Sequence, residues 1–461
     1  MKIHVAFLAC AALALSGFSA DAQSIPNRFP FLDPSGLVET SNAGSAHIDT
    51  SGPFFQSLGS NGRSCATCHM PDQGWSVAPV QTQLRFLLTG GTDPLFRTVD
   101  GSNCDHDINV SSIAGRRSAY SLLLNRGLIR VTMDVPANAQ FRVVSVQNPY
   151  GCSNASTLSL YRRPLPAANL RYLNTVMWDG RESTGAPTQK ITADNYPAAL
   201  IADLAHQALD AVNGHAQGTT PLTDAQQQAI ASFEMGLTTA QFLDFSAGSL
   251  NAHGGKGGSA TLENEPFFIG VNDPLGQNPT NAPFTSKIFD LYDAWENSNH
   301  NDARAAIARG QAVFNNKPIA ITGVAGLNDA TGHPLINGSC GTCHDTPNVG
   351  NHSVAMPLNV GVSDTTSSLN ISYLPVITLQ NIATGEIFQT TDPGRALVTG
   401  QWADIGKFKG PVLRGLAARA PYFHNGSAQS LDDVVDFYNH RFNIGLTAQE
   451  KSDLIAFLKA L

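Results

Sequence analysis

The chain has 461 residues, of which 42% are hydrophobic and 14% charged, so it is long enough for two or more domains with sizeable cores. This composition excludes a disordered chain. The net charge of −8 argues against a nucleic-acid binder or a polybasic membrane-surface protein.

The first 22 residues have the pattern of a secretory signal peptide. Lys2 is the charged start, an apolar run follows from Ile3 to Phe18, and Ala20-Asp21-Ala22 is a small-x-small cleavage site. We expect cleavage after Ala22 and a soluble protein exported to the periplasm. A lipoprotein is disfavoured because no cysteine follows the apolar run. No later stretch approaches the roughly 18 apolar residues of a membrane span.

Residues 23–64 are rich in Pro, Gly, Ser and Asn and predict an extended lead-in to a cysteine motif. The pattern C-x-x-C-H occurs twice, at Cys65, Cys68 and His69 and again at Cys340, Cys343 and His344. It is the attachment sequence of c-type haem, in which both thiols bond to the porphyrin and the histidine ligates iron. A redox dithiol or half a zinc site also uses C-x-x-C. A histidine ending both motifs favours two covalent haems c, with His69 and His344 as iron ligands.

The stretch from 80 to 165 predicts a mixed, partly β insertion. Alternation and β-branched residues predict strands over 128–133 and 141–146, and residues 118–124 resemble a short helix. Farther along, amphipathic patterns predict helices over 200–212 and from Thr223 to Met235.

Residues 246–286 have the composition of a loop, and helices are expected over 286–296 and 302–314. We place a domain boundary near 301–305. The C-terminal part then predicts two capped helices, one starting at Ser430 and one at the capping box Thr447-Ala-Gln-Glu450. The expected fold is mainly α, with c-type cytochrome domains at 23–305 and 306–461 and the insertion inside the first.

The cysteine count also predicts a disulfide. Of seven cysteines, Cys10 lies in the signal peptide and four belong to the haem motifs, which leaves Cys104 and Cys152. In an oxidising compartment this pair is expected to be bonded. Two free buried thiols are the alternative.

Two protein ligands make a haem an electron carrier, whereas a haem with an open face can bind peroxide or dioxygen. The second haem has several candidate sixth ligands, namely His352, Met356, His424 and Tyr438. The first haem has no ligand with diagnostic spacing, although four histidines are possible in principle: His47, His106, His206 and His215. Trp75, just after the first motif, is expected either on the haem edge or in the plain core.

Three features together resemble the bacterial dihaem cytochrome c peroxidase family, which includes the MauG-type enzymes. These are the paired haem motifs, the run Trp178-Asp179-Gly180-Arg181, and the tail segments FKGPVLRG (408–415) and APYFHNGS (420–427). The resemblance does not cover residues 80–165 or 213–300 well. It implies that the His69 haem is peroxidatic, that the His344 haem stores electrons, and that Trp178 relays electrons between them. It also implies a possible calcium ion between the domains.

Several residues depart from the peroxidase pattern. Family peroxidases carry a methionine ligand fourteen positions after the tail histidine, where this chain has Tyr438, as MauG-type proteins do. No histidine occurs between His69 and His106 to serve as a removable distal ligand. The family's distal glutamate would fall at Ala198. Three other side chains remain candidates for its acid–base role: Gln207, His215 and Glu234.

The main hypothesis is therefore a periplasmic dihaem oxidoreductase that activates peroxide or O₂ at the His69 haem. Its partners would be small redox proteins that donate or accept electrons. The alternatives are a non-enzymatic dihaem electron carrier and a haem dioxygenase similar to rubber oxygenases, whose long spacing between haem motifs this chain shares.

Overall fold

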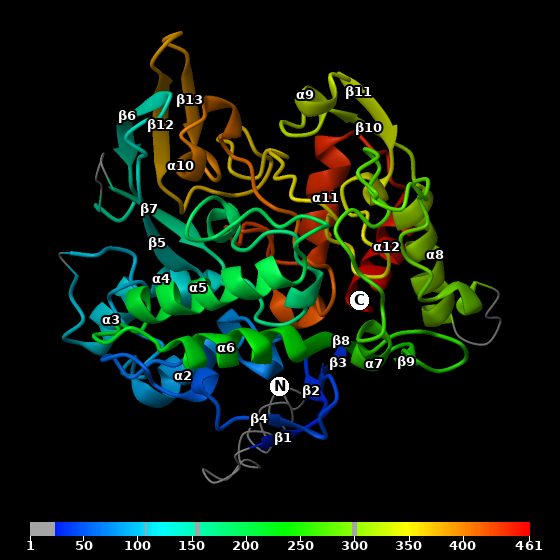
Figure 1. Cartoon of the computed structure of the whole chain (residues 1–461), viewed down its shortest axis with the longest axis horizontal. Helices are drawn as coiled ribbons and strands as arrows, with labels where there is room; N and C mark the ends of the chain where they lie inside the picture. Colours follow the sequence, from blue (N-terminus) through cyan, green and yellow to red (C-terminus); the bar gives the residue numbers. More distant parts are fainter. Residues whose placement is uncertain (1–23, 107, 153–156, 297–301) are drawn as a thin grey trace.

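The computed structural model describes residues 24–106, 108–152, 157–296 and 302–461 (Figure 1). The predicted signal peptide lies outside these ranges. Within them, no helix combines the length and the apolar character needed to cross a bilayer.

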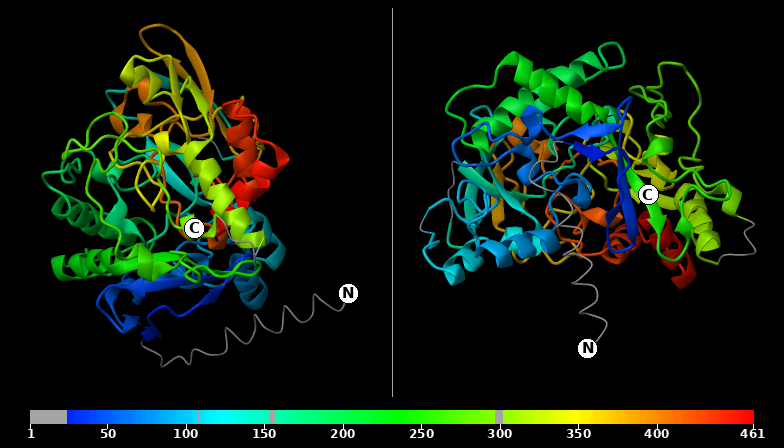
Figure 2. Two further views of the ribbon diagram at one scale, coloured as in Figure 1. Left: turned by 90° about the vertical axis from the view of Figure 1, so that its right-hand side faces the viewer. Right: turned by 90° about the horizontal axis from the view of Figure 1, so that it is seen from below.

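The described helices are distributed along the whole chain. They are α2 (Pro79–Thr89), α3 (Ile113–Ala119), α4 (Ser121–Arg126), α5 (Ala198–Gly214), α6 (Asp224–Gly236), α7 (Ser259–Leu262), α8 (Asp302–Asn316), α9 (Asn328–Thr331), α10 (Ala396–Thr399), α11 (Leu431–Arg441) and α12 (Ala448–Lys459). Figure 2 shows α5 lying beside α6 and α8 lying against α12.

Strands form several small sheets between these helices. They are β1 (Ser24–Pro26), β2 (Phe31–Leu32), β3 (Gly36–Asn42), β4 (His47–Asp49), β5 (Ile129–Asp134), β6 (Phe141–Gln147), β7 (Thr157–Arg162), β8 (Leu237–Asp244), β9 (Gly248–Ser249), β10 (Ile319–Thr322), β11 (Leu335–Gly338), β12 (Val376–Asn381) and β13 (Ile387–Thr390). The sheets have the orders β1-β4, β10-β11, β13-β12-β6, β2-β3-β8-β9 and β5-β7. The expectation of a mainly α fold is therefore only partly right.

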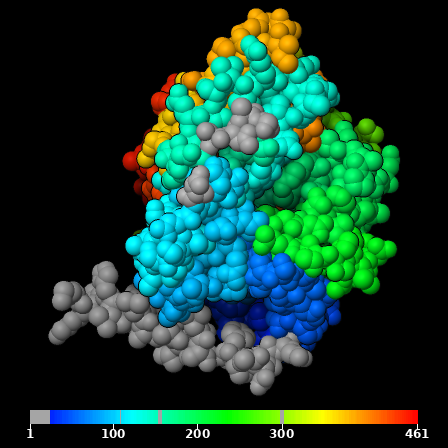
Figure 3. Space-filling model, turned by 90° about the vertical axis from the view of Figure 1, so that its left-hand side faces the viewer, coloured from blue at the N-terminus to red at the C-terminus, as the bar shows by residue number. Residues whose placement is uncertain are grey.

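Both strands predicted in the insertion are confirmed, but they do not pair with each other. β5 pairs antiparallel with β7, and β6 pairs antiparallel with β12 from the C-terminal half. In Figure 3 the cyan and teal residues of the insertion accordingly meet orange residues of the C-terminal half at the top of the molecule. The disulfide between Cys104 and Cys152 is confirmed and staples this region.

The lead-in is more ordered than its composition suggests. β3 pairs antiparallel with β8, which follows nearly 200 residues later in the chain. Gly36 to Asn42 lie opposite Asp244 to Leu237. Trp75 is fully buried beneath β3, where its Nε1 donates to Thr40 Oγ1 at 2.8 Å. Its ring packs against Phe54 and Phe233. Trp75 is therefore a core residue.

Most predicted helices occur where their patterns place them, with one clear error. α5, α6, α8, α11 and α12 are confirmed, including the side-chain caps at Thr223, Ser430 and Thr447. The expected helix at 286–296 is wrong, because only a 3₁₀ turn at Asp293–Trp295 forms there. Asn315 accounts for the difference, since its amide bonds the backbone of Ile288 and Phe289 and holds this run open.

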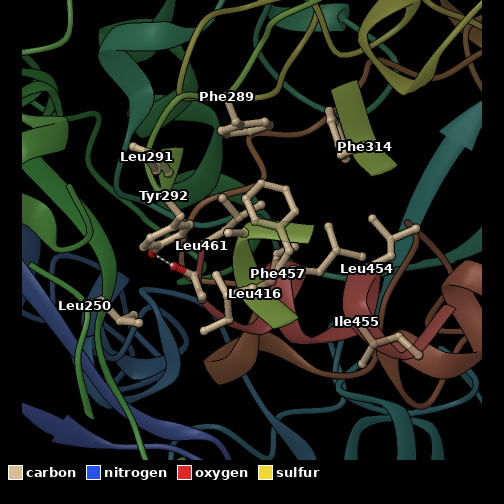
Figure 4. Close-up of a cluster of buried hydrophobic side chains, with 14 of the residues drawn as sticks. Leu250, Phe289, Leu291, Tyr292, Phe314, Leu416, Leu454, Ile455, Phe457 and Leu461 are labelled. Atoms are coloured by element: carbon tan, nitrogen blue, oxygen red, sulfur yellow. Dashed lines mark hydrogen bonds between the residues drawn. The ribbon is translucent and has the colours of Figure 1, made fainter. Parts of the chain in front are cut away.

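This open run forms one side of the largest buried cluster of apolar side chains (Figure 4). Phe289 packs edge-on against Phe314 of α8 and Phe457 of α12. The Tyr292 hydroxyl donates to the Ala460 carbonyl at 2.6 Å. The cluster therefore fixes α8 and α12 behind the second cysteine motif.

Candidate functional site: two adjoining cavities

The first cysteine motif is held in a tight turn. Ser64 caps a 3₁₀ turn over Cys65–Thr67, and His69 Nδ1 lies 2.9 Å from the Trp75 carbonyl. An Nδ1–H that donates to a carbonyl fixes the ring and leaves Nε2 to ligate a metal. Burial lowers the pKa of His69, which favours the neutral imidazole that a metal requires.

The second motif repeats this geometry. Ser339 caps the turn Cys340–Thr342, and His344 Nδ1 lies 2.6 Å from the Gly350 carbonyl. Burial lowers the pKa of His344 to about 4. Two separate segments of the chain therefore present a histidine in the same tautomer and charge state.

The four motif thiols are not bonded to one another. Burial raises the pKa of Cys65, Cys340 and Cys343 to about 12 and also raises that of Cys68. Among the described residues, neither motif takes part in a cluster of three or more ligand-type side chains, so the structure does not favour a zinc site at either motif.

Each motif opens into its own cavity. The first cavity, lined by Cys65, Cys68 and His69, contains about 1590 Å³ of space free of protein atoms, its mouth included. The second cavity, lined by Cys340, Cys343 and His344, contains about 1870 Å³ measured in the same way. The paired thiols and the histidine geometry thus fit a covalently attached haem c in each cavity.

The two cavities share a wall. Trp178, Arg163 and Lys409 line both of them. The Trp178 indole donates from Nε1 to the Arg163 carbonyl at 2.8 Å. The sequence singled out Trp178 but missed Lys409, which is 6% exposed and whose pKa burial lowers to about 7. A lysine inside a protein has no sequence signal of its own.

A buried ion-pair network holds the segment that carries Trp178. Asp179 is fully buried, and its Oδ2 lies 2.5 Å from Arg162 Nη1. The same guanidinium pairs with Asp392 at 2.7 Å. Although burial alone would raise the pKa of Asp179, Arg162 and Arg181 hold it at about 2. The network joins the Trp-Asp-Gly-Arg run to the C-terminal half.

All four predicted ligand candidates for the second haem lie at the second cavity: His352, Met356, His424 and Tyr438. Tyr438 projects from α11, and burial with the nearby Cys343 and Cys340 raises its pKa. His424 stacks on Phe408 with ring centroids 3.8 Å apart, and its Nε2 has no hydrogen-bond partner. Burial lowers the pKa of His424 to about 4.

The first cavity is lined by all three candidates for the acid–base role, Gln207, His215 and Glu234. His215 Nδ1 lies 2.6 Å from Asp100 Oδ2. Glu234 is 6% exposed, its Oε2 has no partner, and burial raises its pKa to about 8. Ala198 is not part of the lining; it begins α5.

The other histidines considered for the first haem lie elsewhere. His206 is bonded to Glu182 at 2.8 Å, and His47 and His106 are exposed. None of the three lines the described walls of the first cavity. His215 is thus the one predicted histidine that the fold brings to the first motif.

The paired cavities and motifs fit the class of c-type dihaem proteins, and comparison with known proteins adds to this. No protein family profile matches the chain. A cytochrome-c peroxidase IdrP2 of Denitromonas iodatirespirans is 36% identical over 135 residues, 27% of this chain and 36% of that protein. The cytochrome c551 peroxidase of Nitrosomonas europaea is 30% identical over 138 residues, 29% of this chain and 34% of that protein.

These alignments confirm the predicted resemblance: the chain is a relative of the cytochrome-c peroxidases, a class of haem c oxidoreductases. The chain spans about a third of the length of these two relatives. Among solved structures, a MauG-like protein associated with microbial copper homeostasis aligns over 88% of this chain and 85% of that one at 17% identity, with a TM-score of 0.35. A diheme peroxidase of Burkholderia thailandensis aligns over 95% of both chains at 16% identity, with a TM-score of 0.29.

The expected calcium ion is not assigned to a site. Two clusters of ligand-type side chains occur among the described residues, one at Glu182, His206 and Asp210 and one at Asp273, Asp345 and His352. Each includes a histidine, whereas calcium takes six to eight oxygen ligands. Calcium between the domains therefore stays a prediction.

Proposed function

We propose that the chain is a periplasmic dihaem c oxidoreductase that reduces peroxide at the haem of the first cavity. Each peroxide would take two electrons and two protons and leave as two waters. The electrons would come from a small redox protein by way of the haem of the second cavity. The observation that carries this proposal is the position of Trp178, whose side chain lines both cavities.

In this proposal Trp178 relays electrons between the haems. Its ring is held at one end by the hydrogen bond to the Arg163 carbonyl. Its backbone carbonyl accepts from the Lys409 N–H at 2.9 Å. With its indole and its backbone each held by a hydrogen bond, Trp178 would keep a constant position between the two cavities.

Tyr438 would close the second haem as its sixth ligand. It lies in the same cavity as His344, and its substitution for the family's methionine favours the ferric and higher oxidation states of the iron. His424, packed flat on Phe408, would support the cavity wall between Tyr438 and Trp178. A closed second haem suits electron exchange and not peroxide binding.

Glu234 would move the protons at the first cavity. A general acid–base needs a titratable group with a pKa near the working pH, and such a group contributes about 10²- to 10⁴-fold. Gln207 does not titrate, whereas His215, bonded through Nδ1 to Asp100, keeps its Nε2 and is the second candidate. Glu234 has a free carboxylate oxygen and a pKa of about 8, so it can release and recover a proton near neutral pH.

Rapid mixing of the reduced holoprotein with hydrogen peroxide, without oxygen, tests the proposal. Two electrons should leave the haems for each peroxide, and a His69→Gly variant should lose the reaction. Turnover of an organic substrate with O₂ alone would favour a dioxygenase instead. If cyanide and CO shift neither haem spectrum, both irons are closed and the protein is an electron carrier.

A further inference from the structure

Three buried side chains of ligand type meet beside the second haem motif, and the proposed function uses none of them. Asp345 and His352 lie at the two ends of the loop that follows His344, and Asp273 comes from the separate segment 270–277. Their exposed fractions are 0%, 2% and 2%. One ligand atom of each lies within 4.8 Å of the others.

Two hydrogen bonds, one from the backbone and one from a side chain, hold the two segments together. The Gly270 N–H donates to the Ser353 carbonyl at 3.1 Å, and Asn272 Nδ2 donates to the Asp345 carbonyl at 3.1 Å. This places Asp273 and Asp345 side by side before any ligand arrives. A preformed arrangement lowers the entropic cost of binding.

Each carboxylate has one oxygen engaged and one oxygen free. Asp273 Oδ2 accepts from the Gln277 N–H at 2.7 Å, and Asp345 Oδ1 accepts from the Ser353 N–H at 2.6 Å. Asp273 Oδ1 and Asp345 Oδ2 are buried without a hydrogen-bond partner. Buried polar atoms without partners are rare in folded proteins, because each has lost its hydrogen bonds to water without replacing them.

The imidazole of His352 is buried, and its Nε2 has no hydrogen-bond partner. Its Nδ1 lies 3.0 Å from Asp345 Oδ2, within ion-pair distance. Two atoms that each bind one metal ion at about 2.1 Å, at 90–110° to each other, are about 3.0–3.4 Å apart. The observed separation is that of neighbouring ligands.

The charges of the cluster are not balanced by the protein. Among the described residues, no lysine or arginine lies within ion-pair distance of Asp273 or Asp345. His352, 3.0 Å from Asp345 Oδ2, is the base beside them, and a single imidazole offsets at most one of the two buried carboxylates. A divalent cation would neutralise both.

We propose that Asp273, Asp345 and His352 bind one divalent transition-metal cation, with zinc as the best fit. Two carboxylate oxygens and one imidazole nitrogen suit zinc, manganese or ferrous iron, and water or the unpartnered hydroxyl of Ser353 would complete the shell. The histidine distinguishes this site from a calcium site, which uses oxygen ligands alone.

The metal would stabilise the proximal side of the second haem. The loop between Asp345 and His352 contains Gly350, whose carbonyl fixes His344. A cation that ties both ends of this loop to Asp273 holds that carbonyl in place. The bond from Asn174 Nδ2 to the His352 carbonyl extends the connection toward the segment that carries Trp178.

The other cluster of ligand-type side chains offers matched controls. His206 is already bonded to Glu182 at 2.8 Å, and Asp210 is exposed. These groups have the same chemistry but are satisfied by protein and solvent. His206→Gln and Asp210→Asn are therefore the controls for His352→Gln and Asp273→Asn.

Metal analysis of the purified holoprotein tests the proposal. After exposure to Zn²⁺ and removal of free ions, mass spectrometry should find one zinc per chain in addition to haem iron. Asp273→Asn and His352→Gln should retain less than about a tenth of it with haem content unchanged, because loss of one ligand from a three-residue site removes most of the affinity. Both control variants should retain it in full.

A holoprotein that retains no zinc under these conditions would overturn the proposal, as would Asp273→Asn and His352→Gln variants that retain as much as the wild type. If the two variants do not fold, calorimetric titration of EDTA-treated wild-type holoprotein with Zn²⁺ still decides the matter. A saturable 1:1 heat supports the site, and no saturable heat refutes it.

Discussion

The Lys409 N–H donates a 2.9 Å hydrogen bond to the carbonyl of Trp178, and both residues line both cavities. Residues 231 positions apart thus form part of one wall between the two cavities. Lys409 is buried, and burial lowers its pKa to about 7. The shared wall therefore combines an aromatic residue with a buried lysine that titrates near neutral pH.

Replacing Trp178 by Phe should slow electron transfer between the haems. The smaller ring loses the hydrogen bond to the Arg163 carbonyl and leaves a gap in the shared wall, so we expect a decrease of about tenfold or more, equivalent to about 1.4 kcal/mol in the barrier. Rapid-mixing spectroscopy of half-reduced holoprotein measures this rate. Trp402→Phe is the control, because Trp402 packs on Phe388 away from both cavities. Equal rates in all three proteins would remove the relay role.

Replacing Tyr438 by Phe should alter the absorption spectrum of the second haem while both haems remain attached. The phenol oxygen is the atom that would ligate iron, and its loss opens the sixth position. Tyr196→Phe is the control, since its hydroxyl donates to the Arg171 carbonyl outside the second cavity. An unchanged spectrum in Tyr438→Phe would exclude Tyr438 as the ligand and leave His424 or Met356.

Replacing Asp179 by Asn should destabilise the protein by about 3–5 kcal/mol, because it leaves the buried Arg162 short of one partner. Urea unfolding monitored by circular dichroism measures the change. Asp210→Asn, at an exposed position, should change stability by less than about 0.5 kcal/mol. A similar small effect in Asp179→Asn would show that the network does not hold the two halves together.

The Asp179 carboxyl also makes the free energy of unfolding depend on pH in the acid range. The arginines hold the folded-state pKa of Asp179 near 2, below the ordinary value of 3.8. Its contribution is therefore fully present above pH 3.8 and is lost as the pH falls through about 2. Asp179→Asn should lose less stability than the wild type over this acid range.

The Glu234 carboxyl should make the free energy of unfolding change with pH in the opposite direction. Burial raises its pKa from 4.5 to about 8, so the folded state holds this proton more tightly than the unfolded chain. Its contribution is present below pH 4.5 and is lost as the pH rises from 4.5 to 8, at up to about 1.4 kcal/mol per pH unit. Urea unfolding at several pH values should show a flatter profile for Glu234→Gln.

Exposed Glu386→Gln serves as the control for this profile. If the stability of Glu234→Gln varies with pH as that of the wild type does, the Glu234 carboxyl is not shielded from water as described. Peroxide reduction by the same variant tests its proposed proton transfer separately, and full activity would move that role to His215.

The parts of this protein that local chemistry encodes could be predicted from the sequence. The C-x-x-C-H motifs and the helix caps at Thr223, Ser430 and Thr447 depend on residue type and spacing, and the Cys104–Cys152 disulfide was predicted from the cysteine count. The false helix at 286–296 had a suitable apolar pattern. Its backbone bonds to Asn315 are a tertiary contact that no local pattern contains.

Long-range pairing could not be predicted either. Nothing in β6 indicates that it pairs with β12, and nothing in residues 246–286 indicates that Asp273 meets Asp345 and His352. The three acid–base candidates all line the first cavity, and their role stays a prediction. Burial separated Glu234 from Gln207 and His215, and burial is a property of the folded chain.

Electron paramagnetic resonance of the oxidised holoprotein, before and after addition of cyanide, tests most directly whether the two haems differ. An open haem in the first cavity predicts one high-spin ferric signal that cyanide converts to low spin and that His69→Gly removes or alters. The second haem should give a low-spin signal that cyanide leaves unchanged. Two low-spin haems that both ignore cyanide would contradict the proposal that peroxide reacts at the first cavity.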